Sequence, residues 1–349
     1  MTADPFFSVD LRSDTVTRPS AEMRIAMAHA EVGDDVNDGD PTVQRLQRTV
    51  AQLLGKQAAL YFPSGTMANL TALLLHARPG TEVLIDVNGH TVHWDMAGSA
   101  AIAGIAFRLV TPSGLVMNAD DVLRTMRPDD HYGIRASLLW LENTHNAAGG
   151  VITSLADMRA LYDLARDASL PTHLDGARLW NASVASGVSL ADYAACADTV
   201  MVSFSKGLGA PVGAALVGNA HDMQLADDIR KRLGGGMRQS GIIAAGALYG
   251  LENHFQRLED DHAAARVFAN IVDGVAGAKV VAPDTNIVMI DLPHPSADDV
   301  VIACEKLGVK VSAWTPSRVR AVTHLDAPLH LVEKGAACVA VALHGTSAG

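Results

Sequence analysis

Short apolar runs alternate with longer segments whose apolar residues recur every three or four positions through the first two thirds of the chain. The short runs have the length of buried strands, and the longer ones have the periodicity of amphipathic helices. The predicted strands are Ala58–Phe62, Glu82–Val87, Ala106–Thr111, Ser137–Leu141, Pro171–Leu174, Thr199–Phe204 and Val212–Val217. The predicted helices between them include Pro41–Leu54, Thr66–His76, Ala119–Arg127 and Leu155–Ala168. This alternation predicts an α/β fold with a mostly parallel seven-stranded sheet covered by helices.

The last third of the chain has a different pattern. It predicts helices over Gly241–Glu259, His262–Val275 and Ala297–Leu307, and strands over Lys279–Ala282, Asn286–Asp291, Val309–Ala313 and Arg320–Thr323. We therefore expect an N-terminal arm over residues 1–15, a large α/β domain over 16–254 and a smaller α+β domain over 255–349. The last six residues, from His344, are expected to fray.

Composition narrows the class of protein. Of 349 residues, 49% are apolar, which excludes a disordered chain, and the net charge of −11 speaks against a nucleic-acid or anionic-membrane partner. The three cysteines form no C-x-x-C pair, and His90 and His93 have no carboxylate–histidine set beside them that would complete a metal site. No secretory leader is visible at the N-terminus, and the uncharged runs are too short to span a bilayer. We expect a soluble, cytoplasmic protein without a metal.

The strongest chemical candidate is Lys206. The chain has seven lysines, and this is the one that directly follows a strand-like run and precedes glycines. Ligands bind at the carboxyl ends of strands in open α/β sheets, and a lysine in such a pocket loses proton affinity and becomes a nucleophilic amine. Asp175 ends another predicted strand thirty-one residues earlier. An acid and a Schiff-base lysine on two strands suit pyridoxal 5′-phosphate (PLP), whose pyridine nitrogen the acid keeps protonated.

Other strand ends carry weaker candidates. Gly65 and Thr66 open a predicted helix and can form an anion site, although an ordinary capped turn explains them as well. The polar segment 142–146 follows an apolar strand and indicates a functional loop. Arg178 lies three residues after Asp175, and a structural ion pair between them is an equal alternative. Three glycines before Arg238 suit close approach to an anion or a flexible hinge.

At these residues the sequence resembles the low-specificity L-threonine aldolases, within the aspartate-aminotransferase-like, fold type I, PLP enzymes. The resemblance runs through 10–19, 32–36, 40–42, 64–66, 142–146, 175–182, 205–213, 234–241 and 320–326, in order and over nearly the whole chain. It implies the fold type I architecture, a large PLP-binding domain and a small C-terminal domain. Family members are usually homotetramers built from dimers that share active sites, so the resemblance also implies an oligomer, with a dimer as the minimum.

The resemblance implies a role for each matching residue. Lys206 would hold PLP as an internal aldimine and Asp175 would pair with its pyridinium nitrogen. Gly65, Thr66 and Arg238 would bind the phosphate, and His90 would stack on the ring. Ser13, Arg178 and Arg320 would bind the substrate carboxylate, and Arg178 is also counted among the cofactor-binding residues. Lys231 would be another lysine of the site.

The implied reaction is retro-aldol cleavage of L-threonine or L-allo-threonine to glycine and acetaldehyde, through an external aldimine and a glycine quinonoid. The base that takes the β-hydroxyl proton would be His90 or His131, and the sequence does not choose between them. One alternative keeps the cofactor chemistry but prefers bulkier, phenylserine-like β-hydroxy amino acids or a transaldolase role. A non-catalytic PLP-binding protein is the remote alternative.

The chain departs from the family pattern in two places. Asn37 stands where relatives usually carry tyrosine, and Asp95 stands where they carry glutamate, with Trp94 before it. We count Asn37 and Trp94 among the substrate-binding candidates, because both changes affect the substrate side. Cofactor binding is expected to be unaffected, whereas substrate preference and stereochemistry at the β-carbon are left open.

Overall fold

The computed structural model describes residues 8–127, 131–294 and 296–346. Its large sheet contains β2 (Ala58–Phe62), β3 (Glu82–Asp86), β4 (Ala106–Val110), β5 (Ala136–Glu142), β6 (Thr172–Gly176), β7 (Thr199–Ser203) and β8 (Ala214–Gly218). The strand order is β2-β8-β7-β6-β5-β3-β4, and β8 alone runs antiparallel to both of its neighbours. All seven predicted strands are present, with ends within two residues of those expected. The predicted fold class is confirmed.

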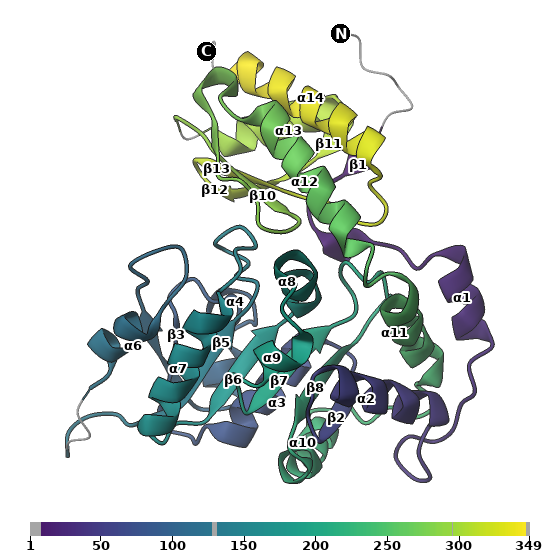
Figure 1. Cartoon of the computed structure of the whole chain (residues 1–349), viewed down its shortest axis with the longest axis vertical. Coiled ribbons are helices and arrows are strands. Elements are labelled where there is room, and N and C mark those ends of the chain that lie inside the picture. The colour runs from purple at the N-terminus through teal and green to yellow at the C-terminus, as the bar shows by residue number, and fades with distance from the viewer. Residues whose placement is uncertain (1–7, 128–130, 295, 347–349) are drawn as a thin grey trace.

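Helices cover both faces of this sheet (Figure 1). The helices of the large domain are α1 (Ala21–Ala28), α2 (Pro41–Leu53), α3 (Gly65–His76), α4 (His90–His93), α5 (Gly98–Ala101), α6 (Ala119–Thr125), α7 (Leu155–Asp167), α8 (Leu179–Ser186), α9 (Leu190–Ala194), α10 (Ala220–Arg232) and α11 (Gly241–Asn253), of which α1 packs on α11 rather than on the sheet. The start of α2 shows why these helices begin where they do. The Asp40 carboxylate accepts hydrogen bonds from the N–H groups of Thr42 and Val43, and Pro41 takes the first helical position.

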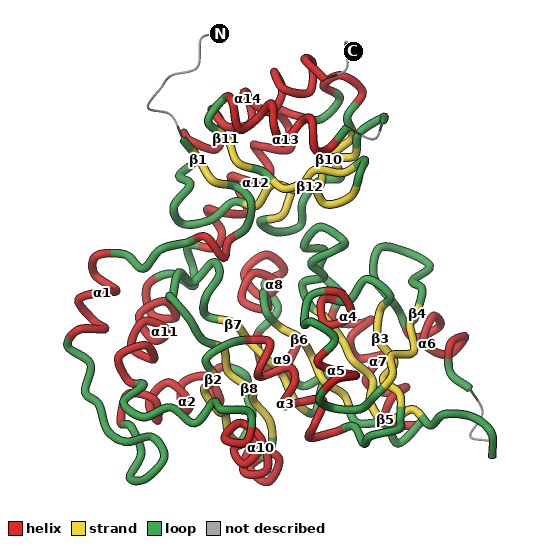
Figure 2. Tube along the Cα trace, turned by 180° about the vertical axis from the view of Figure 1, so that it is seen from behind, coloured by secondary structure: helices red, strands yellow, loops and turns green. Residues whose placement is uncertain are grey.

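The small domain packs three helices on a four-stranded antiparallel sheet. The sheet order is β12 (Ser312–Thr315), β13 (Arg318–Val322), β10 (Ile287–Asp291) and β9 (Lys279–Val280), and the helices are α12 (Leu258–Val272), α13 (Ala297–Lys306) and α14 (Leu329–Thr346). A separate parallel pair joins β1 (Val9–Asp10) to β11 (Val309–Lys310). Val9 and Leu11 lie in the hydrophobic core of this domain. The segment that contains β1 therefore belongs to the small domain, although it precedes the large domain in the sequence (Figure 2).

Three expectations for the helices and strands of the last third were wrong. The helix predicted over Gly241–Glu259 is two helices, because α11 ends at Asn253 and the His254 ring turns inward to the carbonyl oxygen of Leu208, 2.8 Å away. The second helix, expected over His262–Val275, is α12, which begins at Leu258. No proline or glycine marks that break. The strand predicted over Val309–Ala313 is divided between β11 and β12, which belong to different sheets.

The C-terminal end also differs from expectation. Helix α14 was not predicted, and it carries residues 344–346, which we expected to fray. The last three residues lie outside the described part. Residues such as Val332, Val339 and Leu343 bury one side of α14 against the small-domain core. Its small and apolar residues are spread around the helix, so the sequence periodicity that marks an amphipathic helix is weak here.

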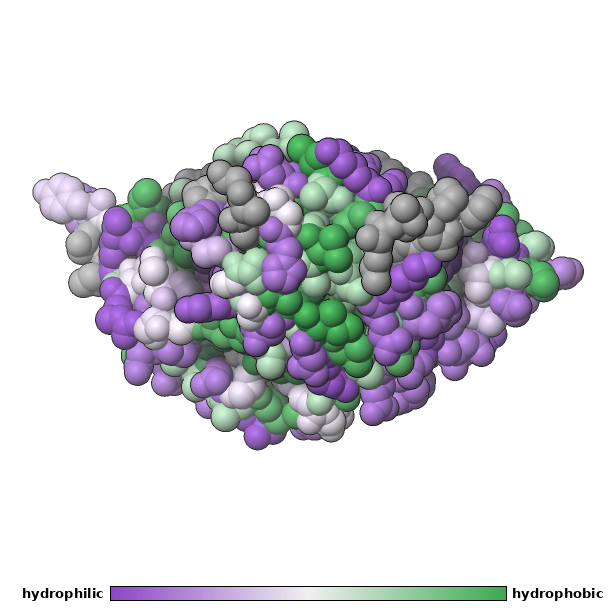
Figure 3. All heavy atoms as spheres, turned by 90° about the horizontal axis from the view of Figure 1, so that it is seen from above, coloured by the Kyte–Doolittle hydropathy of each residue, from purple (hydrophilic) through white to green (hydrophobic). Residues whose placement is uncertain are grey.

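The carboxyl ends of the central parallel strands face the small domain, with α8 between the two layers (Figure 1). Seen from the small-domain end, apolar and polar side chains are interspersed over the surface (Figure 3). Among the described helices none has the length and apolarity needed to cross a bilayer. Because ligands of open α/β sheets bind outside the carboxyl ends of the strands, we expect the binding site between the two domains.

Candidate functional site

A cavity of about 360 Å³ lies between the carboxyl edge of the large sheet and the small domain. Its lining comes from the N-terminal segment, the ends of β5, β6 and β7, helix α4 and strands β12 and β13. The lining residues are Ser13, Thr15, His90, Trp94, Asn146, Arg178, Lys206, Ser312, Ala313, Trp314 and Arg320. Six of the residues singled out in the sequence are thus brought together from segments up to about 300 positions apart.

Lys206 follows β7, which ends three residues earlier, and its side chain lines the cavity. Its backbone is held because its carbonyl oxygen accepts a hydrogen bond of 3.0 Å from the Thr17 hydroxyl. Burial lowers the pKa of the Lys206 amine, and the nearby positive charge of Arg178 lowers it further. Both effects favour the neutral amine, which is the nucleophilic form.

Asp175, near the end of β6, is buried and held by two donors. One carboxylate oxygen accepts from Asn69 Nδ2 at 2.8 Å, and the other accepts from the Ala177 N–H at 3.0 Å. His173 completes the arrangement, since its Nε2 lies 3.3 Å from Asn69 Oδ1 and its Nδ1 lies 2.9 Å from Thr199 Oγ1. Burial keeps the pKa of His173 well below its usual range, so the neutral ring can donate from Nε2 and accept at Nδ1. The network orients Asn69 so that its amide donates to Asp175.

Arg178 makes a forked pair with Asp14, which no sequence signal had singled out. Its Nε and Nη2 donate to the two oxygens of Asp14 at 2.8 and 2.6 Å, and both side chains are buried. The pKa of Asp14 falls far below its usual range because the Arg178 charge and hydrogen bonds outweigh the cost of burial. Asp14 therefore stays ionised and fixes the guanidinium plane of Arg178 toward the cavity.

Arg320 reaches the same cavity from β13 in the small domain. The Asn146 side-chain oxygen accepts one hydrogen bond from Arg178 and one from Arg320, each at 3.2 Å, so it joins the two guanidinium groups. Burial and the Arg178 charge lower the pKa of Arg320 to about 10, which leaves it charged at neutral pH. Within the described ranges no carboxylate pairs with Arg320. Arg178 and Arg320, which lie beside Lys206 and share the Asn146 oxygen, make a site for an anion such as a substrate carboxylate.

His90 begins helix α4 and points its ring into the cavity. Its backbone N–H donates to Glu142 at 2.7 Å, and the other oxygen of Glu142 accepts from the Asn146 N–H at 2.9 Å. One carboxylate at the end of β5 thereby positions both segments. His90 Nδ1 is buried and lies 3.7 Å from Asp95, without a hydrogen-bond partner in the described chain.

The expected phosphate cradle lies at the start of α3. The Asp95 carboxylate accepts from the Thr66 hydroxyl at 3.1 Å, and burial raises the pKa of Asp95. A Cβ at Gly65 would make an ordinary contact with the end of the Met201 side chain, at 3.4 Å. The free N–H groups of the first turn of α3, together with the Thr66 hydroxyl, can bind an anion.

Three predicted residues lie together elsewhere. Asp34 accepts hydrogen bonds from Asn37 at 2.8 Å and from Arg238 at 3.1 Å, and both partners are exposed. Lys231 lies near the same loop, because a Cβ added at Gly236 would be 3.6 Å from its side chain. None of the three lines the cavity of a single chain.

His131 lies outside the cavity as well. It is exposed and packs edge-on against Tyr132 at 5.3 Å, in the segment that precedes β5 and therefore enters the sheet from its amino edge. The two acidic residues before it, 129 and 130, lie outside the described part. Within one chain, His90 is the histidine that reaches the cavity.

Sequence reasoning missed Asp14, Asn69 and Trp314, and it gave Glu142 and Asn146 no individual role. Glu142 and Asn146 did carry a signal, because they belong to the polar run after an apolar strand. Asp14 adjoins a predicted site residue, but no pattern links it with Arg178, 164 positions later. Such pairing is decided by tertiary contact.

The site fits PLP. Of the residues expected to hold the cofactor, Lys206, His90 and Arg178 line the cavity, and Asp175, Gly65, Thr66 and Arg238 do not. The lysine, the buried strand-end carboxylate and the anion-binding helix start come from β7, β6 and α3, and the Asp175 carboxylate is already oriented by Asn69. Among the described residues no cluster of three or more ligating side chains could hold a metal ion. A lysine, a buried carboxylate and a helix start that can bind an anion are the donors that an organic cofactor with an aldehyde, a basic ring nitrogen and a phosphate requires.

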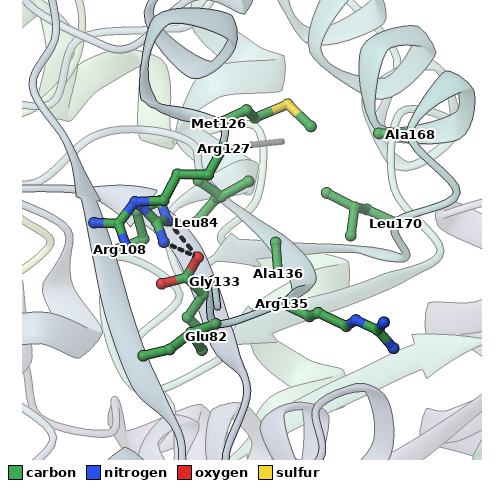
Figure 4. A pocket seen from close by; sticks show the side chains of 11 residues that line it. Glu82, Leu84, Arg108, Met126, Arg127, Gly133, Arg135, Ala136, Ala168 and Leu170 are labelled. Carbon is green, nitrogen blue, oxygen red and sulfur yellow. Dashed lines mark hydrogen bonds and ion pairs between the residues drawn. The ribbon is translucent and has the colours of Figure 1, made fainter. Parts of the chain in front are cut away.

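A second cavity, of about 180 Å³, lies at the opposite, amino edge of the sheet (Figure 4). Glu82 and Arg108 form a buried ion pair in its wall. Arg127 and Arg135 also line it, together with apolar residues such as Leu84 and Leu170. Among the described residues that line it there is no lysine, no histidine and none of the residues predicted to carry the chemistry.

Comparison with known proteins identifies the family of the chain. The beta-eliminating lyase family model matches residues 10–294. The chain is 41% identical over 319 residues to the low-specificity L-threonine aldolase of Escherichia coli K12, covering 91% of this chain and 94% of that protein. It is 38% identical over 326 residues to low-specificity L-threonine aldolase 1 of Arabidopsis thaliana, covering 91% of each.

A structure of Leishmania major threonine aldolase superposes with a TM-score of 0.82 over 96% of this chain and 99% of that one. The two chains are only 17% identical, so this match concerns the fold. The family match and the two relatives above extend over most of the chain. The chain belongs to the beta-eliminating lyases, and within them to the low-specificity L-threonine aldolases.

Proposed function

We propose that this protein is a PLP-dependent aldehyde-lyase that cleaves L-threonine or L-allo-threonine to glycine and acetaldehyde. One observation carries the proposal: Lys206, Arg178 and Arg320 converge on a single cavity at the carboxyl edge of the sheet. The amine can bind a cofactor aldehyde, and the two guanidinium groups can hold an amino-acid carboxylate beside it. The family relationship supports the same activity.

We propose that PLP is bound covalently by Lys206, with Asp175 on its ring nitrogen and the start of α3 on its phosphate. When bound, PLP supplies an acceptor for the electron pair released as the substrate Cα–Cβ bond breaks. Ser13 lies in the same cavity as Arg178 and Arg320 and completes the proposed carboxylate site. Holding that carboxylate fixes the orientation of the bond to be broken, which is a large part of the catalytic contribution.

We assign removal of the β-hydroxyl proton to His90. Its ring lines the cavity, and its Nδ1 lies 3.7 Å from Asp95, which can stabilise the ring when it takes a proton. His131 is the alternative base, and it could act only if another subunit brought it to the cavity.

We also propose that the active enzyme is an oligomer, a tetramer or at least a dimer. Asn37, Lys231, Arg238 and His131 are exposed and do not line the cavity of their own chain, so we assign any role in the site to a neighbouring copy. Mixing Lys206→Ala with Arg238→Ala subunits under exchange conditions should restore part of the activity. If the hybrid stays as inactive as its parents, Arg238 does not act across an interface.

A second substrate class is supported by an aromatic pair at the mouth of the cavity. Trp94 is 54% exposed and lies 5.6 Å, ring to ring, from Trp314. These rings offer an apolar wall to a bulky β-substituent, as in phenylserine-like amino acids. The same cleavage chemistry would then act on a larger side chain.

The test is an absorbance scan of the purified protein, followed by addition of L-threonine and then L-allo-threonine. We expect a band near ~420 nm that borohydride removes, and acetaldehyde release that is faster for one isomer. A yellow protein that releases acetaldehyde from neither isomer, but benzaldehyde from phenylserine, would select the second class. A colourless protein that takes up no added PLP would contradict both.

A further inference from the structure

Trp314 occupies an irregular position in the small-domain sheet. Strand β12 pairs with β13 through Ser312 opposite Arg320 and Ala313 opposite Val319, and the register then shifts before Thr315. Trp314 is the residue at this bulge and has no partner directly opposite. Bulges redirect side chains, and here the indole lies in the cavity wall.

The indole of Trp314 lies against the Arg320 guanidinium, whose central carbon is 4.5 Å from the ring centroid. Two other contacts hold the edge of the same group, from Nη1 to Asn146 at 3.2 Å and from Nη2 to the Arg12 carbonyl at 3.1 Å. Arg320 Nε is buried and makes no hydrogen bond within the described residues. The indole thus contacts one face of the guanidinium, and two hydrogen bonds hold Nη1 and Nη2, while Nε keeps an N–H that is free to donate.

We propose that Trp314 is a positioning residue for Arg320, and that its indole face keeps the guanidinium plane directed at the substrate carboxylate. The inference rests on the proposed function only in taking this cavity as an amino-acid carboxylate site. Arginine has many rotamers, and a cation over an aromatic face is stabilised most strongly when both are partly desolvated. Arg178 is oriented by the carboxylate of Asp14, and Arg320, which has no such partner in the described chain, is oriented by an aromatic ring instead.

This arrangement has a physical advantage over a second carboxylate. A carboxylate on Arg320 would compete with the substrate carboxylate and cancel the charge that attracts it. An indole stabilises the cation without neutralising it, because the ring carries no net charge. The competing explanation is that Trp314 only packs against Trp94 and closes the cavity mouth.

The experiment measures binding to the holoenzyme by titration calorimetry, with glycine and with glycinamide, which lacks the carboxylate. The variants are Trp314→Leu, which keeps apolar bulk, and Trp314→Phe, which keeps an aromatic face. Both are also made in the Arg320→Gln background. Far-ultraviolet circular dichroism and urea unfolding establish that each variant is folded.

If Trp314 acts through Arg320, Trp314→Leu weakens glycine binding by about 5- to 20-fold and glycinamide binding by less than about 2-fold. Trp314→Phe brings glycine binding back to within about 3-fold of wild type. In the Arg320→Gln background the Leu substitution has little further effect, because the group that it positioned is gone.

The proposal is overturned if Trp314→Leu weakens both ligands equally, if Phe is as poor as Leu, or if the effect persists without Arg320. It is also overturned if the wild-type holoenzyme binds glycine no better than glycinamide. Failure of the proposed function gives a different result: no aldehyde release from any β-hydroxy amino acid, while the glycine comparison still decides the role of Trp314.

Discussion

Two buried arginine–carboxylate pairs lie at opposite edges of the same sheet. At the carboxyl edge, Arg178 pairs with Asp14, and at the amino edge, Arg108 pairs with Glu82. All four side chains are at most 8% exposed. Their surroundings differ, because the Arg178 pair joins segments 164 residues apart, whereas the Arg108 pair links the adjacent strands β3 and β4.

The difference shows that a buried ion pair does not by itself mark a site. Glu82 and Arg108 sit on neighbouring strands of a regular ladder, where their pairing supports the sheet. Arg178 keeps a further donor for Asn146, which also accepts from Arg320, and it lines the same cavity as Arg320 and Lys206. A lysine, a histidine and arginines from both domains that converge on one cavity distinguish the binding edge from the structural one.

The largest effect is expected at the lysine. Lys206→Ala should lower aldehyde release by at least about 10³-fold and abolish the ~420 nm band, because it removes the amine proposed to hold the cofactor. Lys56→Ala is the matched control. Burial also lowers the pKa of Lys56, but its amine donates to the Ala197 carbonyl, away from the cavity. Unchanged absorbance and activity in Lys206→Ala would show that this lysine was wrongly assigned.

A second prediction separates the two ion pairs directly. Arg178→Lys and Arg108→Lys each keep the charge but lose the planar fork, so each should lower the free energy of unfolding by about 2–3 kcal/mol. Only Arg178→Lys should also raise KM for the amino-acid substrate, by about 10- to 100-fold. Urea unfolding and steady-state kinetics measure the two effects. A comparable rise in KM for Arg108→Lys would contradict the distinction between the edges.

The third prediction concerns stability alone, with no change in activity, and comes from His262, outside the cavity. Burial lowers its pKa to about 4, and Asn181 Nδ2 donates to its Nε2 at 3.1 Å. Because the folded pKa lies below the unfolded value of 6.5, this stabilisation is complete above pH 6.5. The contribution of the neutral ring to the free energy of unfolding decreases as the pH falls below 6.5, and it is lost once the pH has fallen through 4. Between pH 7 and 4 the wild type should lose about 3 kcal/mol more unfolding free energy than His262→Gln.

Urea titrations at the two pH values measure this difference, and glutamine preserves the acceptor for Asn181. Equal losses in both proteins would mean that His262 is not held neutral. The difference between the two proteins measures how much the contact between α8 and α12 contributes to stability in acid.

The sequence by itself determined the sheet and the strand-end chemistry. Buried parallel strands are short apolar runs, so all seven were identified, and Lys206 and Asp175 followed from their positions at strand ends. The family motifs then implied the site in order along the chain. These signals are local, since each depends on a few neighbouring residues.

Tertiary structure alone decided the contacts that orient the site. Asp14 with Arg178, Trp314 with Arg320 and Asn69 with Asp175 join segments that share no sequence pattern. It also decided that one predicted strand changes sheets at Val311 and that His131 and Arg238 lie outside their own chain's cavity. Local periodicity reports which face of an element is buried, whereas the partner of that face is chosen by the packing of the whole chain.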